Sequence, residues 1–208
     1  MAGRAARLRR PGRRQWLGAL IALGAASSAG WLRARVEAAQ PNDPRTLRPP
    51  GAGTEEDFLG ACLRCGLCVK ACPFDVLRLA DAAGPVPRGT PYFNARASAC
   101  RMCEDVPCQP VCPTSALGPA GLRIGDARMG LAAVRDEARC YSIIGAARCN
   151  ACWKACPLQE QAITMKPGLT ARGGRFTPTV DARVCTGCGL CEQFCIADPP
   201  AITVERVV

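Results

Sequence analysis

The chain has 208 residues, with sixteen cysteines, no histidine and a formal charge of +10. The absence of histidine excludes mixed cysteine–histidine zinc sites, histidine-ligated haem and Ser-His-Asp catalysis. Residues 1–39 carry eight arginines and one glutamate, a net +7, which leaves +3 of the total for the rest of the chain. Because the basic excess is concentrated at the amino terminus, it does not indicate a nucleic-acid-binding surface.

Residues 1–39 have the order of regions that is typical of a bacterial export signal. Arginines open the segment, an apolar stretch covers residues 16–32, and alanine-rich cleavage positions follow near Ala38. The stretch "GRRQWLGAL" resembles a twin-arginine signal, with Arg13 and Arg14 as the pair. Since the apolar stretch is short for a membrane span, we favour export over a retained anchor. We therefore expect a periplasmic protein, exported in the folded state, with membrane association through a partner or an uncleaved signal as the alternative.

A linker is expected over residues 40–57, which are rich in Pro, Gly and charge. The domain that follows, residues 58–208, repeats one cysteine pattern four times. The four runs, numbered in chain order, are Cys62-x2-Cys65-x2-Cys68-x3-Cys72, Cys100-x2-Cys103-x4-Cys108-x3-Cys112, Cys140-x8-Cys149-x2-Cys152-x3-Cys156 and Cys185-x2-Cys188-x2-Cys191-x3-Cys195. Proline follows the last cysteine of the first three runs, and Ile196 takes its place in run 4.

Short secondary-structure elements are expected around these runs. The apolar segments 161–165 and 200–208 are rich in β-branched residues and predict edge strands. Residues 126–139 are alanine-rich and favour a helix, whereas residues 168–180, with Gly173 and Gly174, predict a hairpin turn leading into a strand. We therefore predict an α+β, loop-rich fold of short helices and β-hairpins.

The tight local grouping of the cysteines decides among three kinds of site. Disulfides suit an oxidising compartment and an even cysteine count, but disulfide frameworks spread their cysteines to join distant segments. Zinc needs two C-x2-C pairs, and it does not need three cysteines at steps of three with a fourth and a proline beyond. The run C-x2-C-x2-C-x3-C-P binds 4Fe-4S clusters in bacterial ferredoxins. We therefore predict four 4Fe-4S clusters with all sixteen cysteines as ligands.

In such a run the first three cysteines hold one cluster, and the fourth ligates the other cluster of a pair. Small residues at Gly66, Gly187 and Gly189 would allow the backbone to approach closely. Cys140 is assigned to run 3 because sixteen ligands must divide by four. Two pairings remain open, run 1 with run 2 and run 3 with run 4, or run 1 with run 4 and run 2 with run 3. Either pairing gives two ferredoxin-like modules of two clusters each.

Residues 47–204 also resemble the NapG/MauM group of ferredoxin-type proteins. Besides the cysteine runs, the motifs are "LRPPGA" (47–52), "CGLCVKACPFDVLRLA" (65–80), "GTPYF" (89–93), "CEDVPC" (103–108), "DARMGLA" (126–132), "FTPTV" (176–180) and "CTGCG" (185–189). The resemblance implies an electron carrier, rather than an enzyme, that acts on no small-molecule substrate. Its partners would be a membrane-bound, NapH-like quinol-oxidising protein and a periplasmic redox acceptor.

Two branches of this group imply different acceptors. The NapG branch, our leading expectation, implies electron flow toward periplasmic nitrate reductase. The MauM branch implies electron transfer or maturation for methylamine dehydrogenase. A third alternative is that the chain is the iron–sulfur subunit of a larger oxidoreductase.

Overall fold

The computed structural model describes residues 43–170 and 173–207, which belong to the compact unit from Pro41 to Val208. The predicted export signal, with Arg13 and Arg14, lies outside the described residues. Within the described ranges, no helix combines the length and the apolar character that a membrane span requires.

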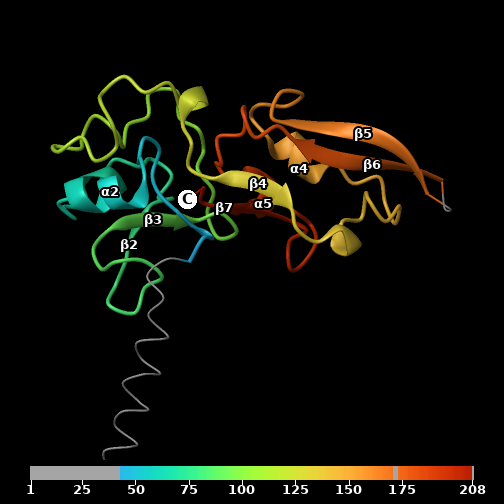
Figure 1. The fold of residues 1–208 in the computed structure, drawn as a ribbon, viewed down its shortest axis with the longest axis horizontal. Coiled ribbons are helices and arrows are strands. Elements are labelled where there is room, and N and C mark those ends of the chain that lie inside the picture. The colour runs from blue at the N-terminus through green and yellow to red at the C-terminus, as the bar shows by residue number, and fades with distance from the viewer. Residues whose placement is uncertain (1–42, 171–172, 208) are drawn as a thin grey trace, which may run out of the picture. The chain divides into compact units, whose positions relative to one another are not determined.

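The described residues form short elements joined by long loops (Figure 1). The helices are α2 (Glu55–Ala61), α3 (Leu67–Lys70), α4 (Ala151–Ala155) and α5 (Leu190–Gln193), with 3₁₀ turns η1 (Ile124–Asp126) and η2 (Glu137–Arg139). The strands are β1 (Thr46–Leu47), β2 (Arg78–Leu79), β3 (Pro91–Asn94), β4 (Leu131–Val134), β5 (Ile163–Thr170), β6 (Gly173–Val180) and β7 (Ile202–Glu205). The loop-rich α+β class predicted from the sequence is therefore confirmed.

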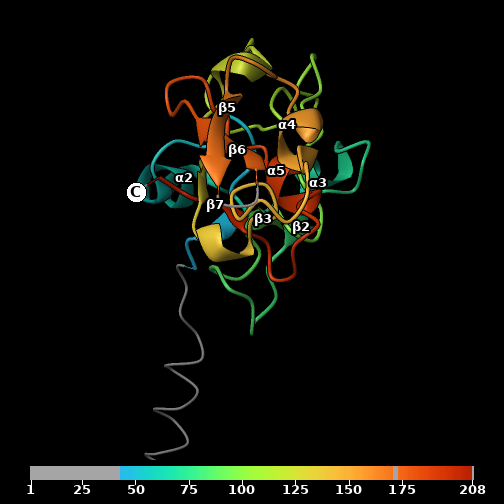
Figure 2. The same ribbon diagram turned by 90° about the vertical axis from the view of Figure 1, so that its right-hand side faces the viewer.

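The strands pair in three small antiparallel sheets within the described residues. One sheet has the order β1-β3-β2, with Leu47 opposite Phe93, and the others are the pairs β4-β7 and β5-β6. Figure 1 and, at right angles to it, Figure 2 show β4, β7 and α5 near the middle of this unit. Strands β5 and β7 confirm the strands expected in segments 161–165 and 200–208.

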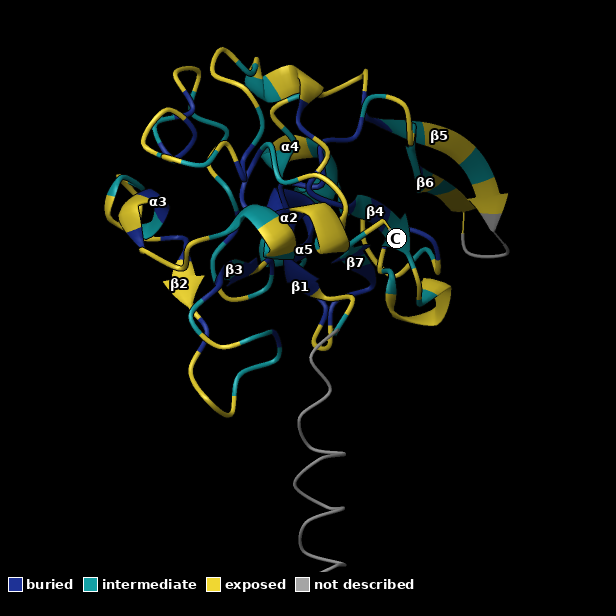
Figure 3. Cartoon of the chain, turned by 60° about the vertical axis from the view of Figure 1, so that its left-hand side comes forward, coloured by how far each residue is buried: buried dark blue, intermediate teal, exposed yellow. Residues whose placement is uncertain are grey.

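Buried residues from all parts of the unit form one hydrophobic core that includes cysteine side chains. Figure 3 shows strands β1 and β7 and helix α5 among the buried elements, whereas β2 is exposed and α3 has both exposed and buried residues. Leu47, Phe58, Phe93 and Val204 are at most 1% exposed and join the amino-terminal segment, β3 and β7. The cysteine loops are thus anchored on a small apolar centre.

The linker expected over residues 40–57 is wrong for residues 46–50, which are buried in the core. Thr46 and Leu47 form β1, and Arg48 is only 3% exposed. The Arg48 guanidinium donates to both carboxylate oxygens of Glu55 and to the Pro91 carbonyl, and it lies 4.8 Å above the ring of Phe58. The composition of this segment predicted a solvated linker because it is rich in charge. The ion pair between Arg48 and Glu55, which allows the Arg48 side chain to be buried, cannot be recognised from composition.

Replacing Arg48 by methionine should lower the free energy of unfolding by about 3 kcal/mol, since breaking a buried, hydrogen-bonded ion pair typically costs 3–5 kcal/mol. Glu55 keeps a second partner, because Arg206 Nη1 donates to it at 2.6 Å. Denaturant unfolding should be compared with that of Arg123→Met, which alters a side chain that is 88% exposed. Equal stability of the two variants would contradict the assigned role of Arg48.

The helix predicted over residues 126–139 is also wrong. Its centre forms β4, which pairs with β7 so that Ala132 lies opposite Val204. Both of these residues are buried, at 2% and 0% exposure. The tertiary contact with a strand far along the chain outweighs the high intrinsic helix propensity of alanine.

The hairpin predicted over residues 168–180 is present as β5 and β6, with Gly168 opposite Arg175. However, Gly173 and Gly174 lie within β6 and pair with Thr170 and Leu169 rather than forming the turn. The glycine pair therefore marks the start of a strand.

Candidate metal centres

The sixteen cysteines, all free thiols in the structure, gather around four cavities. Each cavity is lined by the first three cysteines of one run and by the fourth cysteine of another, and we name it after the run that supplies three. The run-1 cavity has Cys62, Cys65, Cys68 and Cys112, and the run-2 cavity has Cys100, Cys103, Cys108 and Cys72. The run-3 cavity has Cys140, Cys149, Cys152 and Cys195, and the run-4 cavity has Cys185, Cys188, Cys191 and Cys156.

The fourth cysteine of each run therefore crosses to a partner run. Run 1 exchanges its fourth cysteine with run 2, and run 3 exchanges with run 4. Of the two pairings left open by the sequence, the structure has this one. Cys140, separated from the rest of its run by eight residues, lies with Cys149 and Cys152 in the run-3 cavity.

Local geometry explains how a run surrounds its cavity. The third cysteine of runs 1, 3 and 4 lies within a short helix, namely Cys68 in α3, Cys152 in α4 and Cys191 in α5. One helical turn between the second and fourth cysteines carries the fourth away from the other three. The spacing in the sequence thereby becomes a division of ligands between two cavities.

Left-handed backbone residues recur between the first two cysteines of the runs. Arg64 in run 1 and Met102 in run 2 both have φ of +57°, and Gly187 in run 4 has +72° at the same position. Alternation of right- and left-handed residues turns successive amides toward one side, which creates a concavity that suits anionic groups such as iron–sulfur clusters. That a non-glycine residue adopts this conformation twice indicates a local constraint imposed by the loop.

The close approach predicted at the glycines involves protein neighbours. A Cβ atom at Gly187 would lie 2.2 Å from the Gly130 nitrogen, and one at Gly189 would lie 2.5 Å from the Ala95 Cβ. At Gly66 the nearest atom is the Leu79 Cδ1 at 3.2 Å. Gly187 and Gly189 are therefore required for the packing of run 4 against the segments that contain Gly130 and Ala95, as well as for their left-handed φ angles.

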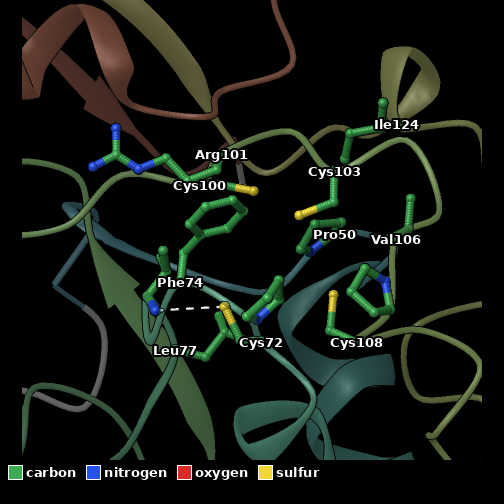
Figure 4. Close-up of a pocket in the computed structure, with 13 residues that line it drawn as sticks. Pro50, Cys72, Phe74, Leu77, Cys100, Arg101, Cys103, Val106, Cys108 and Ile124 are labelled. Carbon is green, nitrogen blue, oxygen red and sulfur yellow. Dashed lines mark hydrogen bonds between the residues drawn. The ribbon is translucent and has the colours of Figure 1, made fainter.

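Apolar side chains and backbone amides complete each cavity. Figure 4 shows Cys72, Cys100, Cys103 and Cys108 around the run-2 cavity with Phe74 beside them, and the Val76 amide donates to Cys72 Sγ at 3.4 Å. In every cavity the residue after the crossing cysteine and an apolar pair further on form part of the lining. These sets are Pro73, Val76 and Leu77; Pro113, Ala116 and Leu117; Pro157, Ala162 and Ile163; and Ile196, Ala201 and Ile202.

Burial disfavours the thiolate form of eight of the sixteen cysteines. It raises the pKa of Cys68 and Cys188 to about 11 and the pKa of Cys100, Cys108 and Cys152 to about 12. Neighbouring cysteines of the same or an adjacent cavity raise these pKa values further, because like charges would lie close together. Thiols of this kind stay protonated near neutral pH unless a cation such as iron stabilises the thiolate.

Cys112, a crossing cysteine, behaves differently. Burial alone would raise its pKa, but hydrogen bonds from the Thr114 amide and hydroxyl and from the Leu117 and Ala116 amides leave the pKa below its usual value. The Thr114 hydroxyl lies 3.8 Å from Cys112 Sγ. Thr114 was not among the residues predicted from the sequence, although its place directly after Cys112-Pro113 was a usable signal.

The four cysteines of each cavity fit a 4Fe-4S cluster. The free volumes of the cavities, including their openings to solvent, are similar at 340–390 Å³. In the part of the chain that the structure describes, no three Cys, Asp or Glu side chains converge closely enough to hold a single metal ion. A 4Fe-4S cluster has iron atoms at separate corners, each of which takes one soft thiolate, so four separated thiols around one small cavity match it.

Comparisons with known proteins agree with this chemistry. A family model described as a 4Fe-4S dicluster domain matches residues 61–116 and 147–198. The first match contains runs 1 and 2, and the second contains run 4 and the last three cysteines of run 3.

Several curated relatives cover most of the chain. The "Methylamine utilization ferredoxin-type protein MauM" of Methylobacillus flagellatus is 50% identical over 76% of this chain and 67% of its own length. The "Ferredoxin-type protein NapG" of Escherichia coli is 45% identical over 93% of this chain and 85% of its own length. The MauM protein of Methylorubrum extorquens is also 45% identical, over 93% of this chain and 89% of its own length.

Proposed function

This chain belongs to the NapG/MauM group of 4Fe-4S ferredoxin-type proteins, and from that membership we propose that it carries four 4Fe-4S clusters in two modules. Run 1 with run 2 would form one module, and run 3 with run 4 the other. The observation that carries the proposal is the division of all sixteen cysteines into four sets of four around cavities of similar size.

The cysteines of each cavity would be the ligands of one cluster, which when bound takes up and releases a single electron. Residues of this chain around each cluster would have two roles. Apolar pairs such as Val76 and Leu77 limit the access of water, and backbone amides such as that of Val76 donate to cysteine sulfur. Solvent access and hydrogen bonds to sulfur are among the factors that set the potential at which such a group is reduced.

We further propose that electrons pass from a membrane-bound, NapH-like quinol-oxidising partner through this protein toward periplasmic nitrate reductase. The similarity to NapG over 93% of the chain supports this route. The 50% identity to a MauM protein favours a second candidate, an electron-transfer or maturation role for methylamine dehydrogenase. In either case the chain is an iron–sulfur electron carrier.

Deletion of the gene from its source bacterium separates the two candidates. Under the nitrate proposal, the deletion strain loses growth that depends on periplasmic nitrate reduction and keeps growth on methylamine. The wild-type gene restores growth, and Cys103→Ala, which removes one proposed ligand, does not. Loss of growth on methylamine alone would overturn the nitrate route and support the MauM-like role, and unimpaired growth under both conditions would contradict both.

We also propose that the protein reaches the periplasm in the folded state through Arg13 and Arg14. Replacing both by lysine keeps the charge but should stop periplasmic accumulation, because the twin-arginine pair is read as a specific signal. Cell fractionation and immunoblotting measure the result, with Arg9→Lys and Arg10→Lys as the matched control. Undiminished export of the Arg13→Lys, Arg14→Lys variant would contradict this route.

A further inference from the structure

The two proposed modules meet at run 2 and run 4. The backbone amide of Cys100 donates to the carbonyl of Cys188 at 2.9 Å, so a ligand candidate of the run-2 cavity is bonded directly to one of the run-4 cavity. Beside it, the Thr186 hydroxyl donates to Met102 Sδ at 3.3 Å. Both contacts join the segment from the first to the second cysteine of run 2 with the corresponding segment of run 4.

Close packing fixes this junction. Gly189 fits against Ala95, where an added Cβ would come within 2.5 Å, and Gly187 fits against the backbone of Gly130. In addition, the Met129 amide donates to the Thr186 carbonyl at 2.8 Å. These contacts leave the run-4 loop little freedom to move against the segments that precede run 2 and β4.

Arg96 joins the same two runs from the side. Its guanidinium donates to the carbonyl of Glu192 at 3.0 Å and to that of Cys195 at 2.8 Å. These carbonyls belong to the last turn of α5 and the residue after its cap, where backbone acceptors lack helical partners. Arg96 precedes Cys100 by four residues, so it holds the start of run 2 against the end of run 4.

Within each module, one short helix connects a cysteine that lines one cavity to a cysteine that lines the other. Cys68 in α3 lines the run-1 cavity, and Cys72 just beyond the helix lines the run-2 cavity. Cys191 in α5 lines the run-4 cavity, and Cys195 lines the run-3 cavity. In Figure 1, α2, which ends next to run 1, and α4, which belongs to run 3, lie on opposite sides of α5.

We infer that the four cavities form one series, in the order run 1, run 2, run 4, run 3, joined at its centre by the Cys100–Cys188 contact and Arg96. The inference rests on the proposed cluster content. It places the run-1 and run-3 cavities at the two ends, where Leu63 and Ile196 in their linings are 66% and 61% exposed. In the run-4 cavity, by contrast, Cys185, Cys188 and Cys191 are all buried. An electron donor and an electron acceptor would therefore contact opposite ends of the series.

Two variants with equal cluster content test the order. Cys65→Ala with Cys149→Ala removes a ligand from each end cavity and leaves the inner pair, whereas Cys103→Ala with Cys185→Ala leaves the end pair. Each variant should retain about eight iron atoms, two clusters of four. After reduction, electron paramagnetic resonance should show spin–spin coupling in the inner-pair variant and loss of that coupling in the end-pair variant. Equal coupling in both, or stronger coupling in the end pair, would overturn the series.

A variant with all sixteen cysteines intact provides a second measurement. Arg96→Met should keep the iron content of the parent but weaken the coupling between the two modules, and Arg96→Lys should restore part of it. Arg123→Met, which alters a side chain that is 88% exposed, is the control. Unchanged coupling in Arg96→Met would contradict its place at the junction. Iron near zero in the unaltered chain would overturn the proposed function, whereas full iron content with equal coupling in the paired variants would overturn the series alone.

Discussion

Replacing Gly187 by alanine should lower the free energy of unfolding by more than about 4 kcal/mol, at the extreme of single-substitution effects. Gly187 has φ of +72°, where a side chain is already strained. The new Cβ would also lie 2.2 Å from the nitrogen and 2.3 Å from the oxygen of Gly130. Because both obstacles are backbone atoms, no side-chain rotation can relieve the overlap.

Gly60→Ala is the matched control for this substitution. Gly60 is exposed in helix α2, and a Cβ there would meet no atom within 4 Å. It should raise stability by about 0.5–1 kcal/mol, since glycine within a helix is less favourable than alanine by that amount. Both variants would be unfolded with denaturant under anaerobic conditions. A Gly187→Ala protein as stable as its parent would contradict the packing of run 4 against Gly130.

The iron lost by double substitutions should show that the fourth cysteine of each run ligates the cluster of its partner run. Two substitutions at one cluster should lose no more iron than either alone. Cys72 is close to Cys65 in sequence but lines the cavity that contains Cys103. Cys72→Ala with Cys103→Ala should therefore lose about four iron atoms, no more than either change alone, because both remove ligands of one cluster. Cys72→Ala with Cys65→Ala should lose about eight, because two clusters are affected.

The reverse result is the clearest contradiction of this ligand assignment. If each run held its own cluster, the pair Cys72 and Cys65 would cost about four iron atoms and the pair Cys72 and Cys103 about eight. Iron and acid-labile sulfide per chain measure the losses after anaerobic purification. The same comparison applies to the other module, with Cys156 paired either with Cys188 or with Cys152.

The sequence was sufficient for the candidate ligands and for the general fold class, because cluster-binding spacing is a local property. Three cysteines at steps of three predict one site without any tertiary information. The partner of each run could not be predicted in this way, since both pairings use the same sixteen cysteines. The contact between Cys100 and Cys188, which joins the two modules, could not be predicted either, because the two residues are 88 positions apart (188 − 100).

Long-range contacts also explain the two wrong predictions, the helix over residues 126–139 and the linker over residues 40–57. Alanine-rich residues 126–139 favour a helix locally, but the pairing of Ala132 with Val204 makes the centre of that segment a strand. Residues 46–48 have the composition of a linker, but Arg48 is neutralised by Glu55 and packs on Phe58. Arg96 likewise gave no signal in the sequence, because its acceptors are backbone carbonyls of run 4.

Iron and acid-labile sulfide per chain in the unaltered protein test the central claim most directly. Purified without oxygen, the folded protein should contain about sixteen iron and sixteen sulfide atoms, four clusters of four iron atoms each. Folded protein with about eight of each would contradict the proposal that every cavity holds a cluster. Folded protein with iron near zero and its thiols paired as disulfides would contradict the assignment of the cysteines as cluster ligands.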